Sequence, residues 1–143
     1  MSKDFRFFDS RQKYLLFVTT TNEKSIVAEK ISNQIKNIKP KKPALNILDA
    51  GLGDGTLLMS ILRNCHREFP TIPFLVFGKE ISMEDVRLSI EKLPDRFVEH
   101  PNMVFVISNL YYSEIASLNS NNPDKQQHIN WEILKLKGIS SFE

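Results

Sequence analysis

Three closely spaced glycines, Gly51, Gly53 and Gly55, follow a short apolar run and are the residues best placed to bind a ligand. Glycine allows the backbone to turn sharply and leaves its N–H groups open, so such a loop could hold a pyrophosphate or a less charged group. The dinucleotide pattern G-x-G-x-x-G is not met, because the third glycine comes one residue early and Thr56 stands in its place. The chain contains no Gly-Lys-Ser/Thr sequence, which excludes a P-loop.

Two acidic residues narrow the choice of ligand. Asp49 lies two residues before the first glycine, where a carboxylate would repel a pyrophosphate and attract an ammonium group. Glu80 follows the next predicted strand, where doubly wound folds commonly place an acid that accepts hydrogen bonds from ribose hydroxyls. A helix dipole would also favour Glu80 at this place, and the two roles are compatible. An amine together with a ribose indicates an aminoacyl-like nucleoside.

The segment Ile47-Leu-Asp-Ala-Gly-Leu-Gly-Asp-Gly55 resembles the first motif of class I S-adenosylmethionine-dependent methyltransferases, and each signature position of that motif is present. The resemblance covers roughly residues 45–118, the cofactor half of that family's domain. It implies that the glycine loop lies along the methionine and ribose of S-adenosylmethionine. The cofactor-binding residues that it implies are Asp49, Gly51, Gly53, Asp54, Gly55, Glu80, Ile81 and Asn109, and no metal is expected.

Individual roles follow from the same resemblance. Asp49 matches the acid that helps to hold the cofactor's amino group, Glu80 the acid that binds the ribose hydroxyls, and Ile81 the apolar neighbour that packs on adenine. Asn109 follows the third predicted strand, where the family often places a side chain that reaches the adenine amino group. Capping of the next helix is an equally good interpretation of Asn109.

The resemblance assigns no catalytic residue. The segment Asn109-Leu-Tyr-Tyr112 is similar to the Asn-Pro-Pro-Tyr motif with which some methyltransferases grip a planar amine. However, Leu110 and Tyr111 replace both prolines, and the segment follows the third strand instead of the fourth. Tyr111 and Tyr112 are expected either to line a substrate pocket or to lie in the core. Lys79 is expected at the surface, since only its nearness to Glu80 would indicate a role.

Short apolar runs and amphipathic patterns predict the elements that must position these residues. Strands are expected over 46–50, 73–78, 103–107 and 129–137, and helices over about 22–38, 58–69, 83–93 and 111–118. Pro94 is expected to stop the third of these helices. The type of the segment 14–18 is left open, and the polar stretch 119–128 is expected to be a loop or linker.

Strands separated by helices indicate parallel β-α-β units. The expected fold is α/β: a doubly wound, mainly parallel sheet with helices on both faces, in an incomplete Rossmann-like methyltransferase fold with about four core strands. Residues 1–43 are expected to form a helical cap segment and linker, and residues 44–143 a truncated Rossmann-like domain that binds S-adenosylmethionine. The last strand would expose an edge carrying Trp131 and Ile133, so self-association or a partner chain is expected there.

Composition restricts the remaining possibilities. With 143 residues, 41% apolar and 25% charged, the chain fits one globular domain. A net charge of +2 falls well short of that of a dedicated nucleic-acid binder. The single cysteine, Cys65, excludes an internal disulfide framework, and the three histidines show no metal spacing. The apolar runs are too short to span a bilayer and no signal-type stretch follows Met1, so a cytoplasmic location and no membrane contact are expected.

We therefore expect the cofactor-binding part of an S-adenosylmethionine-dependent methyltransferase. The acceptor is open among small molecules, RNA, DNA and protein. Methyl transfer needs chiefly the positioning of the methyl group in line with a nucleophile, so whether this chain catalyses transfer by itself is also open. Two alternatives remain. One is a non-catalytic module that binds S-adenosylmethionine or a partner chain, and the other is an NAD-type dinucleotide-binding half-domain, which Asp49 and Thr56 disfavour.

Overall fold

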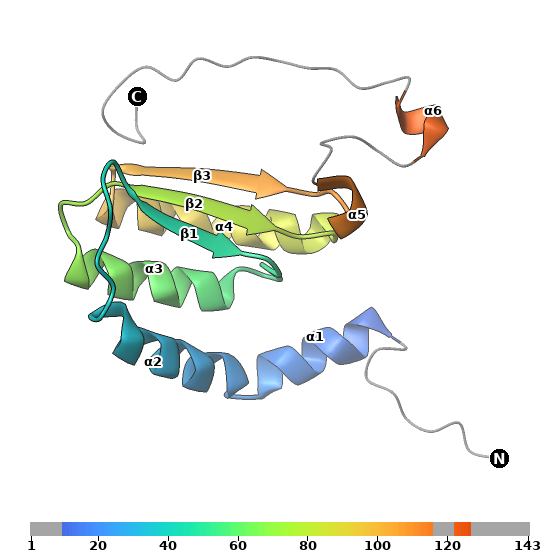
Figure 1. Cartoon of the computed structure of the whole chain (residues 1–143). Coiled ribbons are helices and arrows are strands. Elements are labelled where there is room, and N and C mark those ends of the chain that lie inside the picture. The colour runs from blue at the N-terminus through green and yellow to red at the C-terminus, as the bar shows by residue number, and fades with distance from the viewer. Residues whose placement is uncertain (1–9, 116–121, 127–143) are drawn as a thin grey trace.

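The structure, a computed structural model, describes residues 10–115 and 122–126 (Figure 1). In chain order its elements are α1 (Arg11–Thr20), α2 (Glu23–Ile35), β1 (Leu45–Asp49), α3 (Thr56–Glu68), β2 (Phe74–Lys79), α4 (Met83–Glu99), β3 (Met103–Ser108), α5 (Tyr112–Ile115) and α6 (Pro123–Gln126). The predicted alternation of strands and helices is confirmed from β1 to β3. The predicted fourth strand, 129–137, lies outside the described residues.

A three-stranded parallel sheet in the order β1-β2-β3 forms the centre of the described fold. Its register places Leu45 of β1 beside Phe74 of β2, and Phe74 beside Met103 of β3. α3 and α4 make the crossovers between these strands, as parallel pairing requires. The three carboxyl ends therefore meet at one edge, where the glycine loop, Glu80 and Asn109 follow them. An α/β fold is thus confirmed.

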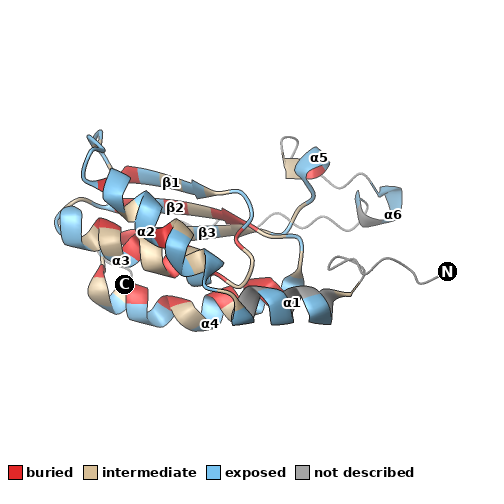
Figure 2. Ribbon diagram, turned by 90° about the horizontal axis from the view of Figure 1, so that it is seen from below, coloured by how far each residue is buried: buried red, intermediate tan, exposed pale blue. Residues whose placement is uncertain are grey.

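The two faces of the sheet differ in their surroundings. Alternate side chains point toward the helices, and on that face Leu45, Phe74 and Val76 are buried. α1, α2, α3 and α4 all lie on this side of the sheet (Figure 1), and buried residues of α2, α3 and α4 mark where these three helices pack (Figure 2). The opposite face is called the helix-free face because none of α1 to α4 lies on it; there Leu48 is 71% exposed and Val104 is 42% exposed. The prediction of helices on both faces is therefore not confirmed in residues 10–115.

α3 follows the glycine loop and packs its apolar side on the sheet. Leu58, Leu62 and Cys65 recur at helical spacing and are all buried. Burial raises the pKa of the Cys65 thiol to about 11, so this thiol is protonated and unreactive at neutral pH. The apolar face predicted for this helix is confirmed at these positions.

α4 is longer than the sequence predicts. The expectation that Pro94 ends the helix is wrong, because α4 continues to Glu99. Proline lacks an N–H and costs the helix one hydrogen bond, but Pro94 lies on the exposed side, and the turn around it is fixed by other contacts. Leu93 is buried in the core, Arg96 pairs with Glu99 at 2.5 Å, and the Arg96 carbonyl accepts the N–H of His100.

The remaining described segments lie at either end of the sheet region in sequence. The segment 14–18 is part of the helix α1, and the helix predicted over 22–38 is α2, which ends at Ile35. The helix predicted over 111–118 is seen as α5, with 116–118 outside the described residues, and α6 is a single turn within the predicted loop. None of the helices described is long and apolar enough to cross a membrane.

Candidate functional site

The glycine loop, residues 50–55, leads from the end of β1 into α3. Gly53 and Gly55 have φ angles of 53° and 76°, which residues with a side chain rarely adopt. A Cβ on Gly55 would lie 2.9 Å from the hydroxyl of Ser89, so this glycine allows the loop to pack against α4. A Cβ on Gly51 would meet no atom within 4 Å. The loop thus combines a glycine needed for packing with one that faces open space.

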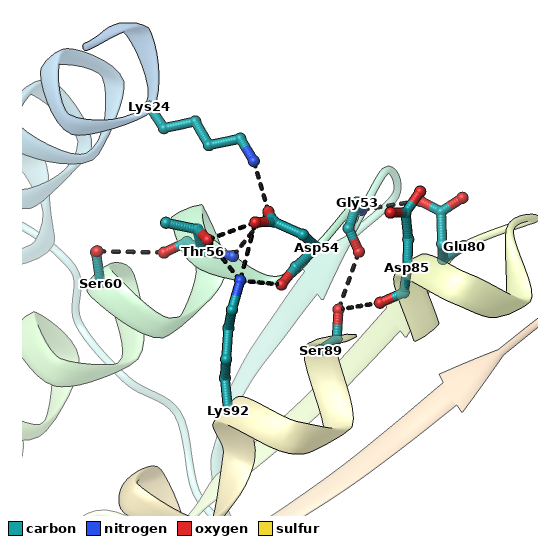
Figure 3. A network of polar contacts seen from close by, with 9 residues as sticks. All are labelled: Lys24, Gly53, Asp54, Thr56, Ser60, Glu80, Asp85, Ser89 and Lys92. Atoms are coloured by element: carbon teal, nitrogen blue, oxygen red, sulfur yellow. Dashed lines mark hydrogen bonds and ion pairs between the residues drawn. The ribbon is translucent and has the colours of Figure 1, made fainter. Parts of the chain in front are cut away.

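Glu80 ties the glycine loop to the start of α4. One carboxylate oxygen accepts a hydrogen bond from the Gly53 N–H at 2.8 Å (Figure 3), and the other accepts one from the Ser82 N–H at 2.9 Å. Ser82 in turn caps α4, where its hydroxyl accepts the N–H of Asp85. An ionised carboxylate has about four lone-pair positions, so these two bonds leave Glu80 acceptor positions for a ligand.

Other residues predicted to bind the cofactor gather at the same edge of the sheet. Asp49 accepts a hydrogen bond from the Gly51 N–H at 3.1 Å. Asn109 donates its amide to the Glu80 carbonyl at 2.7 Å, which joins the ends of β2 and β3. Ile81 is 55% exposed and offers apolar surface beside Glu80. The fold therefore brings together the ends of all three strands with the residues predicted for ligand contact.

Asp54 points toward the helices. Its carboxylate contacts Lys24 of α2 at 2.5 Å and Lys92 of α4 at 2.8 Å, and it accepts hydrogen bonds from the N–H and hydroxyl of Thr56 (Figure 3). Burial alone would raise the pKa of Asp54, but the hydrogen bonds from Lys24, Lys92 and Thr56 outweigh it and hold the pKa well below its ordinary value. Asp54 therefore fastens the glycine loop to two helices.

Lys79 is buried, and the expectation of a surface lysine is wrong. As the last residue of β2 it is 3% exposed, and its Nζ lies 3.7 Å from the centre of the Tyr112 ring. The Tyr112 hydroxyl donates a hydrogen bond to the carbonyl of Ala50, at the start of the glycine loop. Tyr111 and Tyr112 are both largely exposed, so neither lies in the core. Alternation along β2 indicates which face Lys79 takes, but it gives no sign that a tyrosine beyond β3 covers it.

Two histidines meet at the amino-terminal edge of the sheet, a pairing that the sequence does not indicate. His100 Nε2 lies 2.9 Å from the Ile72 carbonyl, which can only accept, so Nε2 carries the proton. His100 Nδ1 must then accept the proton of His66 Nδ1, 3.0 Å away. The His100 ring also stacks on Phe74, with ring centres 3.7 Å apart. The described residues include no group of three His, Cys, Asp or Glu side chains that could hold a metal ion.

A cavity of about 390 Å³ opens between α3 and α4, on the helical side of the molecule. Arg63, Lys92 and Arg96 line it together with Glu91 and Asp95. The residues predicted to bind the cofactor do not line this cavity, and its charges are mixed. It therefore indicates no ligand of definite charge, and the residues predicted to bind the cofactor lie at the carboxyl edge of the sheet instead.

The chain matches no protein-family model and no curated protein. The interpretation of the site therefore depends on its own residues. These are a glycine loop that is open at Gly51 and the carboxylate of Glu80 beside that loop.

Proposed function

We propose that this chain binds S-adenosylmethionine at the carboxyl edge of its sheet and is the cofactor-binding part of a methyltransferase. The observation that supports this most strongly is the position of Glu80. Its carboxylate lies beside the glycine loop and is held by the N–H groups of Gly53 and Ser82. In parallel α/β sheets this edge is where ligands bind, and the acceptor positions left on Glu80 suit the two hydroxyls of a ribose.

Neighbouring residues suit the other parts of the cofactor. Asp49, at the end of β1, offers a negative charge to the amino group. The open space at Gly51 leaves room for the methionine chain, and the exposed side chain of Ile81 offers an apolar surface to adenine. Asn109 follows β3, close to where the adenine amino group would lie. Asp54 acts in this proposal by holding the loop in place.

Catalysis would depend on positioning. Methyl transfer requires the sulfonium methyl to lie in line with an acceptor nucleophile, and a bound cofactor supplies that methyl group. We extend the proposal to the finer features of the fold: a Rossmann-like sheet to which residues 129–137 add a fourth strand, and an apolar edge there that pairs with another chain. A cytoplasmic location is part of the same proposal and agrees with a single cysteine that is buried.

Titration calorimetry with S-adenosylhomocysteine tests the cofactor site. We expect the wild-type chain to bind, and Glu80→Ala to weaken binding by more than about tenfold, or about 1.4 kcal/mol. Glu91→Ala is the matched control, because Glu91 is an exposed carboxylate on α4 whose ion pair, with Arg87, lies along the same helix. Its affinity should equal that of the wild type.

The same experiment separates the alternatives. NAD, titrated in parallel, should not bind, because Asp49 would repel its pyrophosphate. Circular dichroism of each variant must show the wild-type fold, since Glu80 also holds Gly53 and Ser82. A folded wild-type chain that does not bind S-adenosylhomocysteine would contradict the proposal, and one that prefers NAD would replace it with dinucleotide binding.

A further inference from the structure

Lys79 is a buried cation without a counter-charge among residues 10–115 and 122–126. Its side chain belongs to a residue that is 3% exposed, and no hydrogen bond or ion pair joins its ammonium group to any described residue. Its recorded contact is the face of the Tyr112 ring, 3.7 Å from Nζ. Two other charged side chains with little exposure are paired: Arg96 contacts Glu99 at 2.5 Å, and Asp54 contacts Lys92 at 2.8 Å.

A buried ammonium group without a partner is energetically unfavourable. Removal of a charge from water is costly unless an opposite charge or several hydrogen bonds replace the water. A cation–π contact returns only part of that cost. Charges that remain buried in proteins are therefore paired or bind a ligand, and Lys79 is in a position to bind an anion.

The register of the sheet shows what surrounds this ammonium group. Lys79 pairs with Ser108 of β3, and alternation along β2 places its side chain on the helix-free face. One pleat below, on the same face, the register aligns Leu48, Phe77 and Val106 in a row across the three strands. Leu48 and Val106 are exposed. The cation thus lies at the end of an exposed apolar strip, with an aromatic ring beside it.

The position of this strip relates it to the proposed cofactor site. Lys79 directly precedes Glu80, and its carbonyl accepts the N–H of Leu52 in the glycine loop. Because side chains alternate along a strand, Lys79 takes the helix-free side while Glu80 reaches the loop. A molecule lying on the helix-free face against Tyr112 would therefore end beside the cofactor.

We propose that Lys79 binds the carboxylate or phosphate group of an aromatic or otherwise apolar ligand, which lies on Leu48 and Val106 beside Tyr112. Under the proposed function, on which this assignment of a role rests, that ligand is the methyl acceptor. The exposed Tyr112 ring turns aside to admit the anion. Lys79 is then a specificity-determining residue that selects an anionic acceptor.

Three small probes test the site in the full chain: benzoate, phenyl phosphate and the neutral benzamide. Binding is measured by calorimetry or ligand-detected NMR, with and without S-adenosylhomocysteine. We expect at least one anion to bind about tenfold more tightly than benzamide, and the better of the two identifies the carboxylate or the phosphate as the preferred group. Lys79→Met should remove this preference, and Lys79→Arg should keep it.

Lys30→Met is the matched control, because Lys30 is an exposed lysine on α2, and it should bind the anions as the wild type does. If Lys79→Met fails to fold, the affinities of benzoate and benzamide for the wild type and for Lys79→Arg still show whether the site prefers an anion. Equal binding of charged and neutral probes, or anion binding that persists in Lys79→Met, overturns the proposal.

Binding of S-adenosylhomocysteine separates the proposed anion site from the proposed cofactor site. S-adenosylhomocysteine should bind Lys79→Met with an affinity within about twofold of the wild type, because Lys79 lies on the opposite side of β2 from Glu80. Anion binding that depends on Lys79 in a chain that does not bind S-adenosylhomocysteine would support the anion site and reject the methyltransferase. Binding of S-adenosylhomocysteine without a preference for anions would support the cofactor site and reject the anion site.

Discussion

Single residues of the glycine loop have different physical tasks. Gly55 is required by its positive φ angle and by the closeness of Ser89, whereas Gly51 has neither constraint. A turn that served only to pack α3 against the sheet would not need a glycine at position 51. The open side of the loop at Gly51 is therefore the part that sets a ligand-binding loop apart from a packing turn.

Asp54 illustrates how one residue fixes this loop. Asp54→Asn should lower the free energy of unfolding by about 2 kcal/mol at pH 7, because it removes two charge-assisted contacts and leaves Lys24 and Lys92 facing a neutral amide. The pKa of Asp54 is depressed in the folded state. The stabilisation is thus complete above the ordinary carboxyl pKa of about 3.9 and is lost as the pH falls below it.

Urea unfolding of both proteins between pH 7 and pH 2.5 measures this effect. The difference in free energy of unfolding between the wild type and Asp54→Asn should become smaller only at the acidic end of this pH range. Asp95→Asn, which changes an exposed carboxylate on α4, should cost less than about 0.5 kcal/mol throughout. A gap that stays constant down to pH 2.5 would show that Asp54 does not titrate below its ordinary range.

Among the elements, α3 and α4 are fastened to the sheet at both ends. The glycine loop and Glu80 join them at the carboxyl edge, and His66 and His100 join them at the amino edge. His100 lies at the end of α4 and contacts Ile72, just before β2. This pair therefore holds the ends of two helices and the start of a strand in one position.

The histidine pair should make stability depend on pH. Burial is the largest cause and lowers the pKa of His100. The hydrogen bond with the Ile72 carbonyl raises this pKa, and the electrostatic effect of His66, the smallest of the three, lowers it. The folded state thus favours neutral His100, so its contribution is complete above about pH 6.5 and is lost as the pH falls toward the lower folded pKa. His100→Gln should lower the free energy of unfolding by about 2 kcal/mol at pH 7.5. It should also weaken the pH dependence of the free energy of unfolding between pH 7 and pH 5.

Thermal or urea unfolding across that pH range provides the measurement. His66→Gln is the companion variant, because it removes the donor to His100 Nδ1 while leaving the contact with Ile72 in place. It should cost less than His100→Gln. A wild-type stability that does not change from pH 7 to pH 5 would show that His100 takes up its proton without disturbing the pair.

On the scale of the whole molecule, the described fold is a sheet with helices on one face and apolar residues on the other. Matched substitutions compare the two faces. Val76→Thr places a hydroxyl in the buried face, where Val76 is fully inaccessible, and should cost about 1–3 kcal/mol. Val104→Thr makes the same change on the helix-free face and should cost less than about 0.5 kcal/mol.

Urea unfolding followed by circular dichroism distinguishes these outcomes. Both substitutions keep a β-branched side chain, so strand propensity changes little. Similar losses at Val76 and Val104 would mean that the helix-free face is covered in solution. Such a result would support the original expectation that both faces of the sheet are packed.

The sequence by itself determined the order and type of the elements from β1 to β3 and the residues at the carboxyl ends of the strands. Hydrophobic periodicity and glycine spacing are local properties, and parallel pairing brings strand ends to one edge whatever the details of packing. The grouping of the glycine loop with Glu80 and Asn109 could therefore be predicted. The extent of α4 beyond Pro94 could not, because contacts outside the helix stabilise its last turns.

The tertiary structure alone decided which charged side chains became buried and with what partners. Lys24 and Lys92 reach Asp54 from two different helices, and Tyr112 covers Lys79 from beyond β3. Histidines 66 and 100 likewise meet from the ends of two helices. No local pattern marks these pairs, since each depends on how far the crossovers shift one element along another. Local sequence patterns thus place the glycine loop, Glu80 and Asn109 at one edge of the sheet, and the packing of helices and loops decides which charges lie beside them.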